Sequence, residues 1–130
     1  MTADSSAQRY TLSYNERIHL QKDFQQVLTR GRRLVHPALS IYIYRRGDAL
    51  PARRMGLVTS RKVGGAVQRN RLKRRLRELF RLHKNELEPG LDVIFILRSD
   101  GTKLNYQQLE AVVISLWQRA GALATKDQQS

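Results

Sequence analysis

Residues 60–86 read SRKVGGAVQRNRLKRRLRELFRLHKNE, and this stretch organises the rest of the chain. After Gly64 and Gly65, which break the preceding strand pattern, apolar residues recur at the three- and four-residue spacing of a helix. They form one stripe about 100° wide. The stripe consists of Leu72, Leu76, Leu79 and Phe80, with His83 among them. The sequence therefore predicts a helix over residues 66–86 that buries one face in a core.

Basic residues fill the other faces of this helix. Residues 69–84 contain eight basic residues and one acid, Glu78. Like charges at helical spacing repel, and cations in the first turn oppose the helix dipole, so an anion that neutralises them explains the pattern better than a solvated face does. Arg69 borders the apolar stripe, so a structural role stays open for it. The predicted nucleic-acid-binding residues are Arg61, Lys62, Arg69, Asn70, Arg71, Lys73, Arg74 and Arg77.

The positive charge is concentrated around this helix. The chain has 130 residues, of which 24 are Lys or Arg and 11 are Asp or Glu, so its formal net charge is +13. Residues 31–85 hold sixteen of the basic residues and only two of the acidic ones. Such a surface faces a polyanion, which is a nucleic acid, an anionic membrane or an acidic protein. Nucleic acid is favoured, because a membrane-surface helix would leave exposed the apolar residues that the core needs here.

Helix and strand patterns alternate outside the basic helix. Helices are predicted over residues 16–30 and 105–121, the second capped by Asn105, and strands over 39–44, 54–62 and 91–97. Residues 32–38 are a candidate for a further short strand. This order predicts an α+β fold, a two-layer α/β sandwich in which helices pack on one sheet. Residues 16–121 are expected to form a single nucleic-acid-binding domain between flexible tails at residues 1–15 and 122–130.

No catalytic constellation stands out in the sequence. The chain has no cysteine, which excludes a disulfide scaffold, a Cys-ligated metal and a thiol nucleophile. A two-metal nuclease needs clustered carboxylates, whereas residues 31–85 offer only Asp48 and Glu78. Asp92 and Asp100 are interpreted as strand-entry and turn residues, and His83 as a packed, hydrogen-bonded histidine. No catalytic side chain, no protein-bound metal and no membrane span are therefore predicted.

The residues at the start of the basic helix resemble a known family. Residues 66–74, AVQRNRLKR, are similar to the signature of the bacterial ribonuclease P protein component, whose hallmark is Arg-Asn-Arg inside a basic helix. Residues 60–64, SRKVG, resemble the strand end before that helix, and Asp23-Phe24, Val27 and Gly31 resemble the N-terminal helix of the family. The resemblance covers about residues 16–120.

The resemblance implies a fold and a function. The fold would be a mixed, mostly antiparallel sheet of about four strands with three helices and a left-handed β-α-β crossover. The protein would be a monomeric, cytoplasmic subunit of ribonuclease P, an endoribonuclease that removes the 5′ leader from precursor transfer RNA. Its partners would be the catalytic RNA, which performs a Mg²⁺-dependent hydrolysis, and the precursor transfer RNA. The protein alone would bind no cofactor.

The resemblance also implies a groove for the 5′ leader. By position the groove would include Phe24, Leu28 and Tyr42, and the two aromatic rings could stack on single-stranded bases. Instead of binding the leader, Phe24 and Leu28 could simply pack in the core. Tyr42 could be a strand residue that a neighbour covers. Leu28 departs from the aromatic residue expected in some members.

Two other functions compete with this interpretation. A structural RNA-binding protein, such as a ribosomal component or assembly factor, would have the same composition. A DNA-binding protein that uses residues 66–86 as a recognition helix would need a second helix three or four residues away, and the sequence predicts none there.

Overall fold

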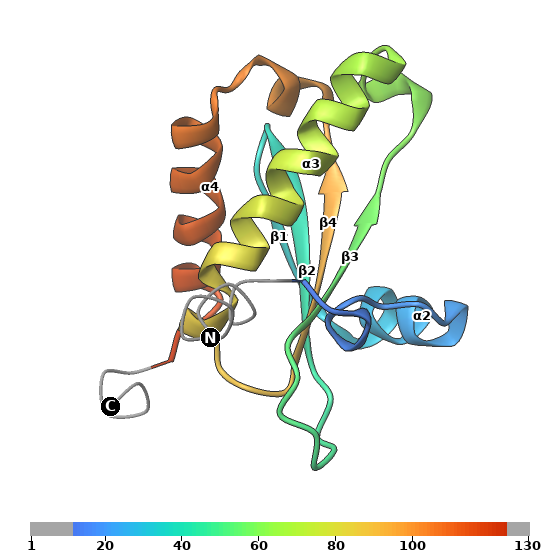
Figure 1. Ribbon diagram of the computed structural model, residues 1–130, viewed down its shortest axis with the longest axis vertical. Coiled ribbons are helices and arrows are strands. Elements are labelled where there is room, and N and C mark those ends of the chain that lie inside the picture. The colour runs from blue at the N-terminus through green and yellow to red at the C-terminus, as the bar shows by residue number, and fades with distance from the viewer. Residues whose placement is uncertain (1–11, 125–130) are drawn as a thin grey trace, which may run out of the picture.

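The computed structural model describes residues 12–124, which form three α-helices and one four-stranded sheet (Figure 1). The α-helices are α2 (Gln21–Arg30), α3 (Ala66–His83) and α4 (Tyr106–Arg119). The strands are β1 (Arg32–Val35), β2 (Leu39–Arg45), β3 (Arg54–Val58) and β4 (Leu91–Leu97). Short 3₁₀ helices are η1 (Tyr14–Glu16), η2 (Arg61–Val63), η3 (Lys84–Glu86) and η4 (Ser99–Lys103). The predicted α+β class is confirmed.

The sheet has the strand order β1-β2-β4-β3. β2 pairs antiparallel with β1 and with β4, whereas β3 pairs parallel with β4. In Figure 1 the chain rises along β3, crosses the near side of the sheet as α3, and returns to β4 on the left of β3. This crossover is left-handed, as the family resemblance implies and against the general preference for right-handed β-α-β units.

The two faces of the sheet carry two separate apolar clusters. Strand alternation sends Ile41, Val93 and Phe95 to the face that packs on α3 and α4, where the main core lies. The opposite face carries Ile94, which is buried beneath α2 together with Val27. In Figure 1 α2 runs sideways relative to the strands, near the end of the sheet where β3 and β4 begin. The strands extend beyond the helix, so α2 covers only part of this face.

The helix α3 buries the predicted apolar stripe. Leu72, Leu76, Leu79 and Phe80 of α3 are all buried, and the Phe80 ring meets the edge of Trp117 on α4 at a centroid distance of 6.4 Å. The first turn of α4 is capped by Asn105, whose Oδ1 accepts the Gln108 N–H at 2.8 Å. Among residues 12–124 no helix is both long and apolar enough to cross a membrane.

Several element boundaries differ from the sequence prediction, three of them for reasons or in ways that the structure makes plain. The first α-helix begins at Gln21 rather than at residue 16, because Arg17 pairs with Met55 at the edge of β3 and the Ile18 N–H donates to the Met55 carbonyl at 2.9 Å. β3 ends at Val58, and residues 61–63 form η2 instead of continuing the strand. α3 ends at His83 and continues as η3.

Both predicted tails fall largely outside the described residues. In the part of them that is described, Tyr14 begins η1, Ala122 is buried, and the Ala124 N–H donates to the Glu86 carbonyl at 2.8 Å.

Candidate nucleic-acid interface

The basic residues of α3 and its C-terminal extension fall into two groups, and the first group is bound by the protein itself. The Arg69 guanidinium donates to the Gly64 carbonyl at 2.9 Å, and that of Arg75 to the Leu104 carbonyl at 2.8 Å. Arg81 is paired with Glu78. Lys84, whose side chain is only 4% exposed, lies 2.6 Å from Glu16. These four cations stabilise the fold. For Arg69, the bond to Gly64 is the structural role that the sequence left open.

The second group has no protein partner. Arg71, Lys73, Arg74 and Arg77 make no hydrogen bond or ion pair with any residue from 12 to 124. Lys73 is half-exposed and the three arginines are exposed. Four unneutralised cations within two turns of helix repel one another. An anion that binds to all four would relieve this repulsion, so this face favours anion binding.

The segment before α3 extends this charged face. Arg61 and Lys62 in η2 and Asn70 in the first turns of α3 are also exposed and, within the described chain, unpaired. The chain enters α3 through Gly64, whose φ of +153° disfavours other residues, and a Cβ there would lie 2.4 Å from the Gln68 Oε1 atom. The same Gln68 oxygen accepts the Gly65 N–H at 3.1 Å.

The three residues predicted for a leader groove also come together. Phe24 and Leu28 from α2 and Tyr42 from β2 belong to the apolar cluster on the α2 face of the sheet, and each is half-buried. The Phe24 ring lies directly against Gly56 of β3, where a Cβ would approach the ring to 2.6 Å. Each of the three therefore has one side packed and another side accessible.

A cleft connects this cluster with the basic helix. Its volume is about 260 Å³, and its lining includes Arg17, Phe24, Gly56 and Arg77. Phe24 comes from α2 and Arg77 from α3, so residues of both predicted sets line one cleft at the edge formed by β3. The connection arises because β3 is an edge strand.

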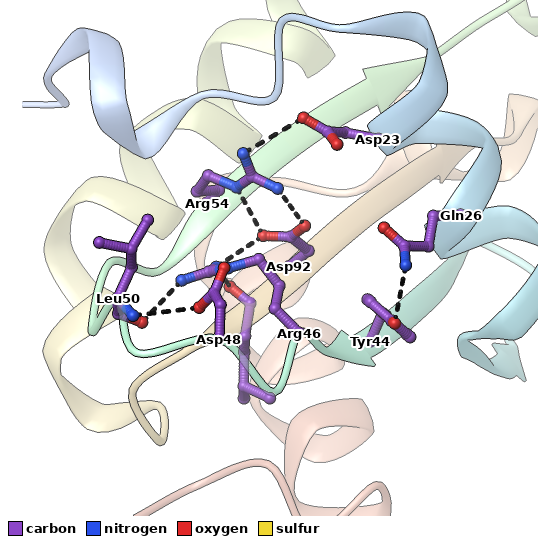
Figure 2. Close-up of polar contacts among 9 residues, drawn as sticks. Asp23, Gln26, Tyr44, Arg46, Asp48, Leu50, Arg54 and Asp92 are labelled. Atoms are coloured by element: carbon purple, nitrogen blue, oxygen red, sulfur yellow. Dashed lines mark hydrogen bonds and ion pairs between the residues drawn. The ribbon is translucent and has the colours of Figure 1, made fainter.

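An ion-pair network holds α2 beside this edge (Figure 2). Asp92 of β4 is buried, and its carboxylate accepts two hydrogen bonds from Arg54 at 2.8 and 2.6 Å and one from Arg46 at 2.8 Å. Arg54 also reaches Asp23 on α2 at 3.4 Å. Hydrogen bonding to Asp92 raises the pKa of the Arg54 guanidinium above its ordinary value, since it stabilises the charged form. Asp92, interpreted from sequence as a strand-entry residue, is thus the centre of a network.

His83 is hydrogen-bonded, as predicted, and links α3 to α4. Its Nε2 atom lies 2.7 Å from Glu110, and its Nδ1 atom contacts Glu86. Burial lowers the pKa of His83, but the hydrogen bonds to Glu110 and Glu86 outweigh it, so the pKa lies above 6.5. Within residues 12–124 no three His, Asp or Glu side chains converge as a metal site would require.

Comparisons with known proteins identify the family of the chain. The family model for ribonuclease P matches residues 12–121. The ribonuclease P protein component of Dictyoglomus thermophilum is 34% identical over 117 residues, which cover 88% of this chain and 95% of that protein. The ribonuclease P protein component of Geobacillus kaustophilus is 35% identical over 114 residues, which cover 88% and 93% of the two chains.

Solved structures give the same result. The RNase P protein of Staphylococcus aureus is similar with a TM-score of 0.74 and 27% identity, covering 84% of this chain and 98% of that one. The RNase P protein of Thermotoga maritima has a TM-score of 0.68 and 29% identity, with coverages of 80% and 96%. The basic helix, the sheet order and these matches together show that the chain belongs to the ribonuclease P protein component family.

Proposed function

We propose that this protein is the subunit of a ribonuclease P ribonucleoprotein that docks on the catalytic RNA through α3 and holds the 5′ leader of precursor transfer RNA on the α2 face of its sheet. The catalytic RNA carries out the Mg²⁺-dependent hydrolysis, and the protein contributes binding and positioning. The complex works in the cytoplasm with one protein on each RNA. In this proposal the Mg²⁺ ions belong to the RNA–protein complex and none is assigned to the protein alone.

The observation that carries this proposal is the cleft shared by Phe24 and Arg77. A subunit that joins two RNAs needs a cationic surface for one and a stacking surface for the other, and the two must be adjacent. Single-stranded RNA binds on aromatic rings with little sequence preference, and its phosphates follow cationic side chains. Phe24 and Tyr42 provide rings on one side of the β3 edge, and the unpaired arginines of α3 provide charge on the other.

The roles divide by residue. Arg61, Lys62, Asn70, Arg71, Lys73, Arg74 and Arg77 contact the catalytic RNA. Arg69 acts mainly by holding the Gly64 carbonyl, which fixes the entry of the chain into α3. Phe24 and Tyr42 stack on leader bases, while Leu28 supplies apolar surface in the same cluster.

Replacing Tyr42 tests the leader site. In the holoenzyme reconstituted with a bacterial ribonuclease P RNA, Tyr42→Ala should weaken precursor transfer RNA binding by about 1–3 kcal/mol, the value of one base–aromatic stack. Binding of mature transfer RNA, which has no leader, should stay unchanged. Equilibrium binding of the two labelled RNAs measures both affinities.

Tyr14→Ala is the matched control, because Tyr14 is an exposed tyrosine outside the α2-face cluster. It should leave both affinities as they are. Equal losses for precursor and mature transfer RNA in Tyr42→Ala would instead favour a structural RNA-binding protein without a leader site.

A further inference from the structure

The α2 face of the sheet ends at an arginine that neither the sequence pattern nor the leader site accounts for. Strand register places Arg33 of β1 directly opposite Tyr42 of β2, so the two side chains emerge from the same face as neighbours. Tyr42 is in turn opposite Ile94, and Ile94 is opposite Gly56. One transverse row therefore crosses all four strands, from Arg33 at one edge to Gly56, covered by the Phe24 ring, at the other.

The charge of Arg33 is unneutralised in the described structure. The side chain is exposed and makes no hydrogen bond or ion pair with any residue from 12 to 124. The acids on this face, Asp92 and Asp23, both bind Arg54, which lies on β3 at the opposite edge of the sheet from Arg33. A free guanidinium next to a half-exposed tyrosine forms the pair of groups that a nucleotide requires, one for its phosphate and one for its base.

The strand order gives this arrangement a direction. The cleft with Phe24 and Arg77 lies at the β3 edge, whereas Arg33 lies at the β1 edge. Three strand spacings of about 4.8 Å separate the two edges, so the row is roughly 14 Å long. RNA that enters from the basic helix meets Phe24 first, Tyr42 next and Arg33 last.

We propose that Arg33 binds a backbone phosphate of the single-stranded leader just after the nucleotide stacked on Tyr42, which makes the β1 edge the exit of the leader path. This inference rests on the proposed function, because it extends the leader site by one residue. It assigns Arg33 as a positioning residue for the leader and gives it no role in binding the catalytic RNA.

The chain contains a matched control for this proposal. Arg32 is the preceding residue of β1, and it is also exposed and, within the described part of the chain, unpaired. Its register partner is Ile43, whose side chain belongs to the main core on the opposite face. Arg32→Ala and Arg33→Ala remove the same charge from adjacent positions on opposite faces of one strand.

The test uses holoenzyme reconstituted with a bacterial ribonuclease P RNA. Arg33→Ala should lower the affinity for precursor transfer RNA about five- to tenfold, and the slope of log affinity against log salt should fall by about 0.7, the value of one single-strand phosphate. Arg33→Lys should restore most of the slope, since it keeps the charge. Arg32→Ala should change neither quantity, and mature transfer RNA should bind all variants equally.

A series of leader lengths separates this proposal from the one on which it rests. The loss caused by Tyr42→Ala should begin at a shorter leader than the loss caused by Arg33→Ala, because the leader reaches Tyr42 first. If Tyr42→Ala weakens precursor binding but Arg33→Ala matches Arg32→Ala at every length, Arg33 is not a leader contact and the leader site stands. If neither variant discriminates precursor from mature transfer RNA, the leader site itself fails.

Discussion

At the scale of single residues, Asp92 connects three segments of the structure through one buried carboxylate. Its buried carboxylate accepts hydrogen bonds from Arg54, which begins β3, and from Arg46, which directly follows β2. β2 and β3 are the two strands that flank β4 in the sheet. A buried carboxylate costs several kcal/mol of desolvation unless its oxygens are paired. Here both oxygens are paired, so the network fixes where β3 and α2 lie relative to β4.

Removing this carboxylate should therefore destabilise the folded protein. Asp92→Ala should lower the free energy of unfolding by about 3–5 kcal/mol, because it removes the buried carboxylate that two guanidinium groups share. Urea unfolding monitored by circular dichroism measures the change. The control is Asp100→Ala, since Asp100 is exposed and has only a 3.5 Å ion pair with Lys103, and its effect should stay below about 1 kcal/mol. A loss of similar size in both variants would mean that the network is not a source of stability.

His83 predicts a pH dependence of stability. Its pKa in the folded protein lies above 6.5, because the hydrogen bonds to Glu110 and Glu86 outweigh the effect of burial. Protons thus bind more tightly to the folded state, so the stabilisation is present below pH 6.5 and disappears as the pH rises through the raised pKa. Wild type should exceed His83→Gln in stability at pH 6, and the difference should shrink towards pH 9.

Unfolding curves at several pH values measure this difference. A difference between wild type and His83→Gln that grows with pH would contradict the assigned ion pairs.

At the scale of elements, α3 combines two uses of basic residues on one helix. Arg75 binds the Leu104 carbonyl and so attaches the helix to the segment before α4, whereas Arg71 and Arg74 make no hydrogen bond or ion pair with any described residue. The arginines look alike in the sequence. Only the tertiary structure reveals which of them meet a carbonyl.

The two groups should respond differently to mutation. Changing Arg71, Lys73, Arg74 and Arg77 together to Ala should reduce the salt dependence of RNA binding by up to about three units of log–log slope, at roughly 0.7–0.9 for each phosphate. Stability should change little or rise, because like-charge repulsion is removed. Filter binding to ribonuclease P RNA over a range of KCl concentrations measures the slope.

Arg75→Ala is the control on the same helix. It should destabilise the fold through the lost bond to Leu104 while leaving the salt slope unchanged. If the quadruple variant keeps the wild-type slope, α3 is not the RNA-binding helix.

Element prediction from the sequence worked where the signal is local. The stripe of α3 and the Asn105 cap of α4 depend on residues within a few positions of each other, and both are confirmed. The start of α2 was wrong, because residues 17 and 18 pair with Met55, almost forty positions away, and no local pattern records that. For the same reason the sequence did not reveal the network, in which 38 and 46 residues separate Asp92 from its partners.

At the scale of the whole molecule, the topology required more than periodicity. The α+β class follows from the order of the elements, but the left-handed crossover through α3 opposes the general rule and was expected only from the family resemblance. The clustering of Phe24, Leu28 and Tyr42 was likewise expected from the resemblance, and it is present in the structure. Arg33 was not expected, since its position beside Tyr42 depends on the pairing of β1 with β2.

The central claim is that this chain acts with RNA to process transfer RNA. The most direct measurement mixes the purified protein with a bacterial ribonuclease P RNA and a 5′-labelled precursor transfer RNA at low Mg²⁺ concentration, and follows release of the leader. The account predicts cleavage that needs both protein and RNA, with no product from the protein alone. Cleavage by the protein alone would contradict the account by revealing a protein active site. Absence of cleavage with RNAs that this protein demonstrably binds would show that it is a structural RNA-binding protein instead.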